Sequence, residues 1–260
     1  MAVRPGRAAA AAAPWSNGVI SVVIPALNEA AGIERTLAGL QAWRERGHEI
    51  LLVDGGSEDG TPTRAAPYVD AVLAAPKGRA SQMNAGAAAA RGDWLLFLHA
   101  DSLLPPDALA QLRTAMRSDA GWGRFDVCLS GRHPLLRIVA LLMNLRSAWT
   151  GIATGDQAMF VRRAWFDAVG GYARIPLMED VALSRRLLER ARPFLIRSPV
   201  ATDSRRWEQK GIWRTIALMW RLRWQYWRGA DPAVLAQRYY PASQRCSPPM
   251  DDSHSAFRQR

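Results

Sequence analysis

The sequence predicts an α/β fold, in which helices flank a mostly parallel, Rossmann-like sheet. Short segments rich in Val, Ile and Leu alternate with segments of helical periodicity, which is typical of right-handed βαβ units. The apolar segments are continuous, as expected for strands that are buried on both faces of a parallel sheet. Polar residues cluster directly after these strands, where parallel sheets bind their ligands.

The first hundred residues are expected to hold four strands separated by helices. Pro25 closes the first strand, and Asn28 is expected to cap the helix that follows it. The predicted strands cover residues 19–25, 50–53, 71–74 and 93–98, and the predicted helices cover residues 29–46, 61–68 and 82–90.

Polar side chains follow three of these four strands. Asn28 and Glu29 come after the first strand, Asp54 comes after the second, and His99 and Asp101 come after the fourth. Because the carboxyl ends of parallel strands meet at one edge of a sheet, the sequence predicts a single site built from three separate strand ends.

The remainder of the chain is less regular. Residues 1–17 are expected to form a disordered leader, with a targeting segment as the alternative, and residues 241–260 a disordered tail. No apolar run in the sequence is long enough to span a membrane. Helices are expected at 104–116, 135–148 and 177–189, strands at 123–129 and 158–161, and a basic, aromatic helical extension at 209–240.

The composition favours a folded protein with anionic partners. Of the 260 residues 49% are apolar, which allows a sizeable core, and the formal charge is +11. Nucleotides, phosphorylated lipids or a membrane surface would suit this charge, although an arginine-preferring proteome would also produce it. The basic residues are dispersed without a nucleic-acid-binding motif, so no nucleic acid partner is expected. Cys128 and Cys246 form no disulfide framework or zinc motif, which favours a cytoplasmic location.

His99 and Asp101 point to a metal and nucleotide site. Residues two apart on an extended segment place their side chains on one face, so one can hold a cation while the other meets a neighbouring part of the ligand. Mg²⁺ and Mn²⁺ take one or two protein carboxylates and complete their shell with substrate phosphates. Taken alone, the pair is better explained by a capping Asp beside a packed His, and it is the wider sequence context that favours a ligand site.

The chain resembles family 2 glycosyltransferases across residues 19–200, with the family's motifs in the family's order. More narrowly, it resembles a bacterial subfamily, the selenodomain-associated transferase 2 proteins. The resemblance is carried by VVIPALNE at 22–29, VDGGSEDGT at 53–61, NAG at 84–86, the segment 92–101, GDQAMFVRR at 155–163, MED at 178–180 and SRRW at 204–207.

This resemblance implies a GT-A fold with a nucleotide-binding half at 18–102 and an acceptor half at 103–208. It implies an inverting transfer from a nucleoside-diphosphate sugar, with UDP favoured, and a divalent cation, Mn²⁺ or Mg²⁺. Asp101 would bind the metal and Asp54 would contact the base, while His99 replaces a frequent Asp and is expected at the ribose. Pro25, Asn28, Glu29 and Arg79 are expected to line the nucleotide pocket.

An inverting transfer needs a base for the acceptor proton, and the resemblance assigns this role to Asp180, beside Glu179. A plain acidic helix start is the alternative interpretation of this pair, because the helix dipole favours carboxylates there. Four further residues are expected at the acceptor or the diphosphate: Asp156, Gln157, Arg206 and Trp207. A structural turn is the alternative for the first two.

The extension at 209–240 allows two interpretations. Its tryptophans alternate with arginines, and no acidic residue lies between Lys210 and Asp231. Such a helix can lie in the interface of an anionic membrane, at the inner face of the plasma membrane, with a lipid-like acceptor. It can equally pack on the core with its arginines extended to water.

Two other classes of protein are considered. A nucleotidyltransferase would show a glycine-rich, basic phosphate loop after the first strand, where this sequence has Pro-Ala-Leu-Asn-Glu. A non-catalytic protein that binds nucleotide or a membrane surface would keep the fold, but the retained Asp54, Asp101 and Asp180 argue against it.

Overall fold

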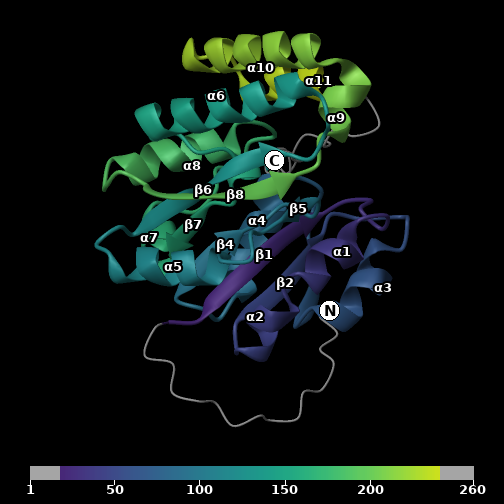
Figure 1. The fold of residues 1–260 in the computed structure, drawn as a ribbon, viewed down its shortest axis with the longest axis vertical. Coiled ribbons are helices and arrows are strands. Elements are labelled where there is room, and N and C mark those ends of the chain that lie inside the picture. Colours follow the sequence, from purple (N-terminus) through teal and green to yellow (C-terminus); the bar gives the residue numbers. More distant parts are fainter. Residues whose placement is uncertain (1–17, 241–260) are drawn as a thin grey trace, which may run out of the picture.

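The structure is a computed structural model that describes residues 18–240 (Figure 1). The predicted leader, the predicted tail and Cys246 lie outside the described residues. Within the described part, strands form one sheet in the order β3-β2-β1-β4-β7-β6-β8-β5. The strands are β1 (Ile20–Ala26), β2 (Glu49–Asp54), β3 (Ala71–Ala74), β4 (Trp94–Phe97), β5 (Ser102–Leu103), β6 (Trp122–Leu129), β7 (Phe160–Arg162) and β8 (Phe194–Thr202).

Helices cover both faces of this sheet, and the predicted α/β class is confirmed (Figure 1). The helices are α1 (Ile33–Ala38), α2 (Gln41–Glu45), α3 (Thr61–Ala65), α4 (Arg79–Ala89), α5 (Ala108–Arg117), α6 (Pro134–Thr150), α7 (Arg163–Ala168), α8 (Glu179–Leu188), α9 (Arg205–Lys210), α10 (Ile212–Trp227) and α11 (Pro232–Tyr239), with 3₁₀ turns η1 (Ala66–Tyr68) and η2 (Gly155–Gln157). None of the helices within residues 18–240 has the length and apolarity that crossing a membrane requires.

Parallel pairing brings the strand ends to one edge of the sheet. β1 pairs in parallel with β2, where Ala26 faces Asp54, and with β4, where Val23 faces Phe97. The backbone N–H of Leu98 also donates to the carbonyl of Val23, which continues the pairing beyond β4. The carboxyl ends of these three strands therefore lie together, as the sequence predicts.

The other half of the sheet is mixed, and two of its strands were not predicted from the sequence. β7 is antiparallel to β4 and β6, and β5 is antiparallel to β8, whereas β6 and β8 are parallel. The register between β6 and β8 shifts where Asp126 comes opposite Pro199. Proline and polar residues within β8 interrupt the apolar run that identifies a buried strand, which explains why it was missed.

The single helix predicted at 29–46 was wrong. α1 and α2 are separate, and the chain turns at Gly39 and Leu40 between them. Asn28 caps neither helix, since its φ is 56° and its Oδ1 atom accepts a hydrogen bond from the backbone N–H of Glu58. Asn28 instead ties the end of β1 to the loop after β2.

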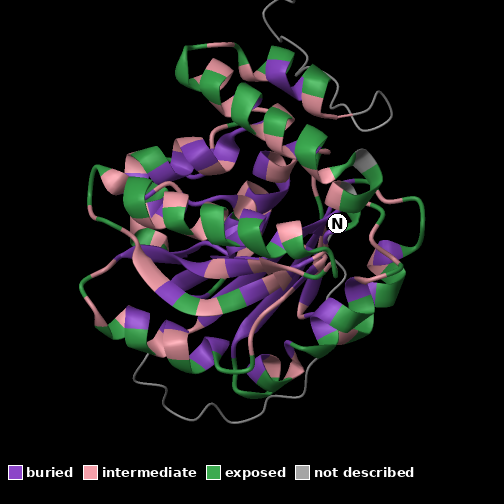
Figure 2. Cartoon of the chain, turned by 45° about the horizontal axis from the view of Figure 1, so that its top comes forward, coloured by how far each residue is buried: buried purple, intermediate pink, exposed green. Residues whose placement is uncertain are grey.

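Two apolar clusters fill the two faces of the sheet, and a third joins the C-terminal helices to α8 (Figure 2). In the third cluster Leu222 of α10 and Leu235 of α11 pack against Leu177, Met178 and Val181 at the start of α8. The extension therefore packs on the core through one face, which confirms one of its two interpretations.

α4 lies directly against β1 and β2 because Gly86 has no side chain. A Cβ atom at this position would overlap with the side chains of Val23 and Val53. Asn84, two residues earlier on the helix, exchanges two hydrogen bonds with the backbone of Tyr172, at 2.8 and 2.9 Å. The Asn-Ala-Gly motif thus fixes the position of α4, whose first residue is Arg79.

We expect Gly86→Ala to lower the free energy of unfolding by about 1–3 kcal/mol, because the added methyl overpacks a filled interface. In an open helix the same change would stabilise by about 1 kcal/mol. Urea unfolding followed by circular dichroism measures the difference. Gly39→Ala is the matched control, since Gly39 has helical angles and a Cβ atom there has room. An unchanged or raised stability of Gly86→Ala would contradict the close packing of α4.

Candidate functional site

A cavity of about 190 Å³ lies at the carboxyl ends of β1 and β4, between the start of α4 and the end of α11. Several predicted nucleotide residues meet in it. Its lining residues are Pro25, Ala26, Leu27, Glu29, Lys77, Gly78, Arg79, Gln82, His99, Ala100, Asp101, Pro176 and Tyr240. Of the predicted donor-side residues, Asn28 and Asp54 lie outside this lining. The cavity therefore joins two of the three predicted strand ends.

Asp54 is buried beside the cavity with half of its carboxylate unpaired. Its Oδ2 atom accepts hydrogen bonds from the backbone N–H groups of Gly56 and Ser57, at 2.9 and 3.0 Å. Its Oδ1 atom is buried and has no hydrogen-bond partner among residues 18–240. A buried acceptor without a partner is costly, so this atom is suited to a ligand that brings an N–H or O–H donor.

Gln82 was missed by the sequence analysis and holds the two neighbouring strand ends together. Its Nε2 atom donates to the carbonyl oxygens of Ala26 and Val53, each at 2.8 Å. Its side chain also lies against Gly55, where a Cβ atom would come within 3.0 Å of it. Nothing in the local sequence distinguishes this glutamine from a solvent-facing helical residue.

His99 connects the end of β4 to η2. Its Nδ1 atom lies 3.4 Å from Oδ1 of Asp156, and its ring packs on Gly155, where an added Cβ atom would be 2.5 Å from Nε2. Burial of Asp156 favours its neutral form, but the hydrogen bond from His99 and the charges of His99, Arg79 and Arg223 outweigh it, lowering the pKa of Asp156 to about 2.

The same turn reaches the predicted base. The backbone N–H of Gly155 donates to Oδ2 of Asp180 at 2.9 Å, and Oδ1 of Asp180 accepts from the N–H of Val181 at 2.7 Å. Asp180 is thereby oriented at the start of α8. The structure brings together the predicted residues His99, Asp156 and Asp180, which are far apart in the sequence.

Gln157 is buried in η2 and supports this turn. It forms a capping box with Thr154, whose backbone N–H donates to Oε1 of Gln157 at 3.2 Å. Its Nε2 atom donates to Oδ1 of Asn144 on α6 at 3.3 Å. With these partners it acts as a support of the turn, which is the alternative interpretation given by the sequence.

Glu179 is buried next to Asp180. Burial is the main cause of a raised pKa for Glu179, and the neighbouring charge of Asp180 adds to it, so that its pKa is about 7. Met178, which precedes the pair, is buried and adopts a left-handed conformation with φ of 70°. Such a conformation in a non-glycine residue costs of order 1–3 kcal/mol and often occurs at functional sites.

Cations face these carboxylates from several elements. Burial alone would lower the pKa of Arg79, but Tyr240, Tyr239, Glu179 and Asp156 reverse this and raise it. Burial, followed by the charge of Arg223, lowers the pKa of Arg146 to about 9. Arg146 of α6 and Arg223 of α10 both interact electrostatically with Asp156 and Asp180. Sequence analysis missed this role for the two arginines, because they resemble the solvated basic residues around them.

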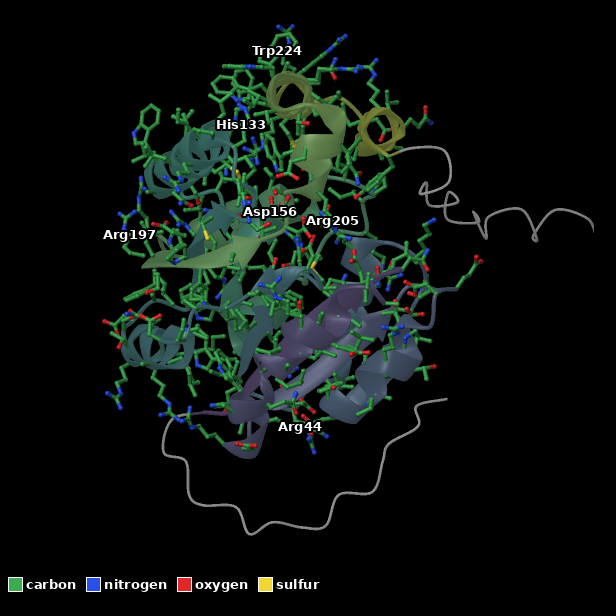
Figure 3. The ribbon with its side chains drawn as sticks, turned by 45° about the vertical axis from the view of Figure 1, so that its right-hand side comes forward. Arg44, His133, Asp156, Arg197, Arg205 and Trp224 are labelled. Atoms are coloured by element: carbon green, nitrogen blue, oxygen red, sulfur yellow. The ribbon has the colours of Figure 1, made fainter. Side chains whose placement is uncertain are left out.

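The segment after β8 also reaches the cavity, through Arg205, the neighbour of the predicted Arg206. The guanidinium of Arg205 forms ion pairs with the carboxylates of Glu29, at 3.3 Å, and Asp203, at 2.8 Å. In Figure 3, Arg205 and Asp156 are seen at about the same height in the molecule. The side chain of Arg206 lies outside the described residues, and Trp207 is half-buried on α9. The SRRW motif indicated the segment, but two adjacent arginines cannot be distinguished from sequence alone.

The residues present fit a cation that completes its shell with ligand phosphates. No group of three or more His, Cys, Asp or Glu residues within 18–240 is arranged to hold a metal by itself. Burial raises the pKa of Glu29, and the nearby charge of Asp101 raises it further. Glu29 and Asp101 therefore repel each other at one cavity, beside His99. Mg²⁺ and Mn²⁺ bind to such a site, because they need only one or two protein carboxylates.

A cavity at the carboxyl edge of a parallel sheet, with carboxylates and arginines around it, is typical of α/β proteins that bind anionic ligands. The family model for glycosyl transferase family 2 matches residues 21–165, more than half of the chain. The chain belongs to this family. The narrower subfamily resemblance stays a prediction.

A curated relative and two solved structures illustrate the similarity. The chain is 30% identical over 175 residues to a PGL/p-HBAD biosynthesis glycosyltransferase of Mycobacterium bovis, a match that covers 59% of this chain and 63% of that protein. It therefore spans less than two thirds of the relative's length. One similar solved structure is a mannosyltransferase from Pyrobaculum calidifontis in complex with GDP-Man and Mn²⁺. It matches with a TM-score of 0.55 and 23% identity, over 74% of this chain and 58% of that one. Another is glucosyl-3-phosphoglycerate synthase from Mycobacterium tuberculosis with Mn²⁺, UDP and glucosyl-3-phosphoglycerate, which matches with a TM-score of 0.55 and 20% identity over 71% of each chain. At these identities the structures show the fold, and they confirm the predicted GT-A fold.

The raised pKa of Glu179 predicts a specific pH dependence of stability. Between its ordinary value of 4.5 and about 7, the folded protein holds a proton on Glu179 that the unfolded chain has released. Its contribution to stability is therefore complete below pH 4.5 and is lost as the pH rises to 7. We expect the free energy of unfolding of the wild type to fall relative to Glu179→Gln across this window, as measured by urea unfolding. Glu45→Gln, at an exposed position on α2, is the control. Parallel profiles of wild type and Glu179→Gln would contradict the shift.

Proposed function

We propose that this protein is an inverting glycosyltransferase that moves a sugar from a nucleoside-diphosphate sugar, with UDP favoured, to an acceptor that has a lipid-like part. The proposal rests on one observation above all. The His99–Asp156 contact and the hydrogen bond from Gly155 to Asp180 join the strand-end pair at the cavity to a carboxylate that can act as base. Family membership and the GT-A fold support it.

On the donor side, the proposal assigns the unpaired Oδ1 atom of Asp54 to a donor group of the base. Pro25, Glu29 and Arg79 line the cavity for the nucleotide, with His99 at the ribose. Asn28 acts indirectly, because it holds the loop that follows Asp54. Residues 18–102 would then form the donor half and residues 103–208 the acceptor half of one GT-A domain.

A divalent cation would be held by Asp101 and the diphosphate of the donor. When bound, it neutralises the charge that develops on the leaving diphosphate. Lys77 and Arg79 line this cavity, and Arg205 reaches it through its ion pair with Glu29. An arginine can fork to two phosphate oxygens. The two solved structures, which are complexes with Mn²⁺ and GDP-Man or UDP, support the use of a cation here.

The transfer is a single displacement. Asp180 accepts the proton of the acceptor hydroxyl, the acceptor oxygen forms a bond to the anomeric carbon, and the nucleoside diphosphate leaves from the opposite face with the bonding electrons. The N–H groups of Gly155 and Val181 fix the orientation of Asp180. Glu179, which burial and Asp180 keep protonated up to about pH 7, limits the negative charge of the pair.

The first test is nucleotide binding. We expect one of UDP, GDP, CDP and ADP to bind in the presence of Mn²⁺ or Mg²⁺, as measured by isothermal titration calorimetry, and chelation or Asp101→Ala to weaken it at least about tenfold. Asp167→Ala, at an exposed carboxylate on α7, is the matched control and should bind like the wild type. Absence of binding to all four nucleotides would reject the donor site. Binding without turnover of any sugar conjugate would favour the alternative, a non-catalytic nucleotide-binding protein.

The second test concerns the base. Asp180→Asn should bind the nucleotide like the wild type and lose about 10²–10⁴-fold in turnover, because the acceptor proton then has no base. Until the acceptor is known, turnover is measured as hydrolysis of the donor sugar, in which water replaces the acceptor. Asp167→Asn serves as the control. Hydrolysis at the wild-type rate by Asp180→Asn would remove Asp180 from the mechanism.

A further inference from the structure

The large apolar side chains that remain exposed are concentrated at one end of the molecule. Within residues 18–240, every one of them lies on α6, α10 or α11. They are Ile138, Leu141, Leu142, Leu145 and Trp149 of α6, Trp213, Trp220, Trp224 and Trp227 of α10, and Val234 of α11. Contiguous exposed apolar surface is rare on soluble proteins and marks an interaction site. We name the exposed residues of α6 and α10 the α6–α10 face.

The spacing shows that each helix presents a continuous apolar stripe. On α10, Trp213, Trp220, Trp224 and Trp227 recur at intervals of seven, four and three residues, so they lie on one side of the helix. The α6 residues follow the same rule, from Ile138 to Trp149. Figure 1 shows both helices at the same end of the molecule, and in Figure 3 the side chain of Trp224 points outward at the end opposite to Arg44.

The charged residues on the two helices themselves all have one sign. α6 and α10 contain no acidic residue, and no Asp or Glu occurs between Asp126 and Asp156 or between Glu208 and Asp231. Arg137, Arg214, Arg221 and Arg228 are exposed on or beside the two helices, and the guanidinium of Arg228 lies 5.0 Å from the ring of Trp224. Tryptophan and arginine together are typical of the boundary between lipid headgroups and acyl chains.

We propose that the α6–α10 face seats the protein on an anionic lipid bilayer. The tryptophans and leucines enter the headgroup region, and the flanking arginines bind lipid phosphates. A second copy of the chain suits this face less well, because a two-fold contact would set the arginines of one copy against the same arginines of the other. The proposal does not depend on the proposed function, since docking needs neither nucleotide nor turnover.

Docking in this way would place the acceptor side of the site next to the bilayer. The inner sides of the same two helices carry Arg146 and Arg223, which interact electrostatically with Asp156 and Asp180. Asn144 of α6 also binds Gln157 of η2 directly. A lipid-like acceptor could then reach Asp180 from the membrane without leaving it.

The test is flotation of the full chain, without nucleotide, on vesicles of phosphatidylcholine with or without phosphatidylglycerol. We expect binding to the anionic vesicles that weakens with added salt. Arg214→Glu combined with Arg221→Glu should weaken partitioning by roughly 25-fold or more, since each arginine near an anionic surface contributes about fivefold. Arg35→Glu combined with Arg46→Glu makes the same change of charge at exposed positions near α1 and α2, and it should bind like the wild type.

A second measurement uses the wild type, so it does not depend on a variant folding: brominated lipids should quench its tryptophan fluorescence. Changing Trp220 and Trp224 to Ser should reduce this quenching in part, because Trp149, Trp213 and Trp227 remain exposed on the face, while the thermal unfolding midpoint stays unchanged. Failure to float on anionic vesicles, or equal losses in both pairs of arginine variants, would overturn the proposal. A stable dimer in solution that shields these tryptophans and does not float would assign the face to a second copy instead.

Discussion

The contact between His99 and the turn at Gly155 and Asp156 is the interaction on which the arrangement of the site depends. His99 ends a buried strand of the half that carries the cavity, and η2 belongs to the other half. Gly155 lets the imidazole lie directly on the backbone, Asp156 holds its Nδ1 atom, and the N–H of Gly155 orients Asp180. A larger residue at 155 would separate these three groups at once, so one glycine couples the cavity to the carboxylate pair.

Around this contact, the protonation states of the carboxyl groups are set by burial and by neighbouring charged side chains. Asp156 is strongly ionised because His99, Arg79 and Arg223 surround it, whereas Glu179 is driven toward its neutral form by burial and by Asp180. The two carboxyl groups therefore have opposite tendencies within one site, a separation that acid–base chemistry requires. The orientation of Asp180 comes from two backbone N–H groups, which cannot rotate away as side chains do.

Sequence patterns revealed the first half of the fold more completely than the second. Parallel strands such as β2 and β4 contain continuous apolar runs, and their ends carry the predicted Asp54 and His99. β8 is only partly buried and lies beside a register shift, so it can contain Arg197, Ser198 and Pro199. These residues interrupt the apolar run, and the sequence of β8 therefore lacks a strand pattern. The supporting contacts of Gln82 and Arg146 could not be predicted from the sequence for a different reason. The roles of these two residues depend on which element packs against them, and no local sequence pattern encodes that.

The last turns of α6 reverse the usual amphipathic pattern. A surface helix normally turns its apolar side inward, yet the last turns of α6 direct Asn144 and the buried atoms of Arg146 and Ser147 inward, while Leu145 and Trp149 face outward. In water this arrangement costs free energy on both sides of the helix, because the buried polar atoms lack partners and the apolar surface stays hydrated. A bilayer against the outer side would remove the cost of hydrating the apolar surface. The cost of the unpaired polar atoms is tolerable at a site whose ligand carries negative charge, since the unpaired guanidinium atoms of Arg146 are then available to that ligand. One helix can satisfy both conditions only if the site and the membrane lie on its two opposite sides.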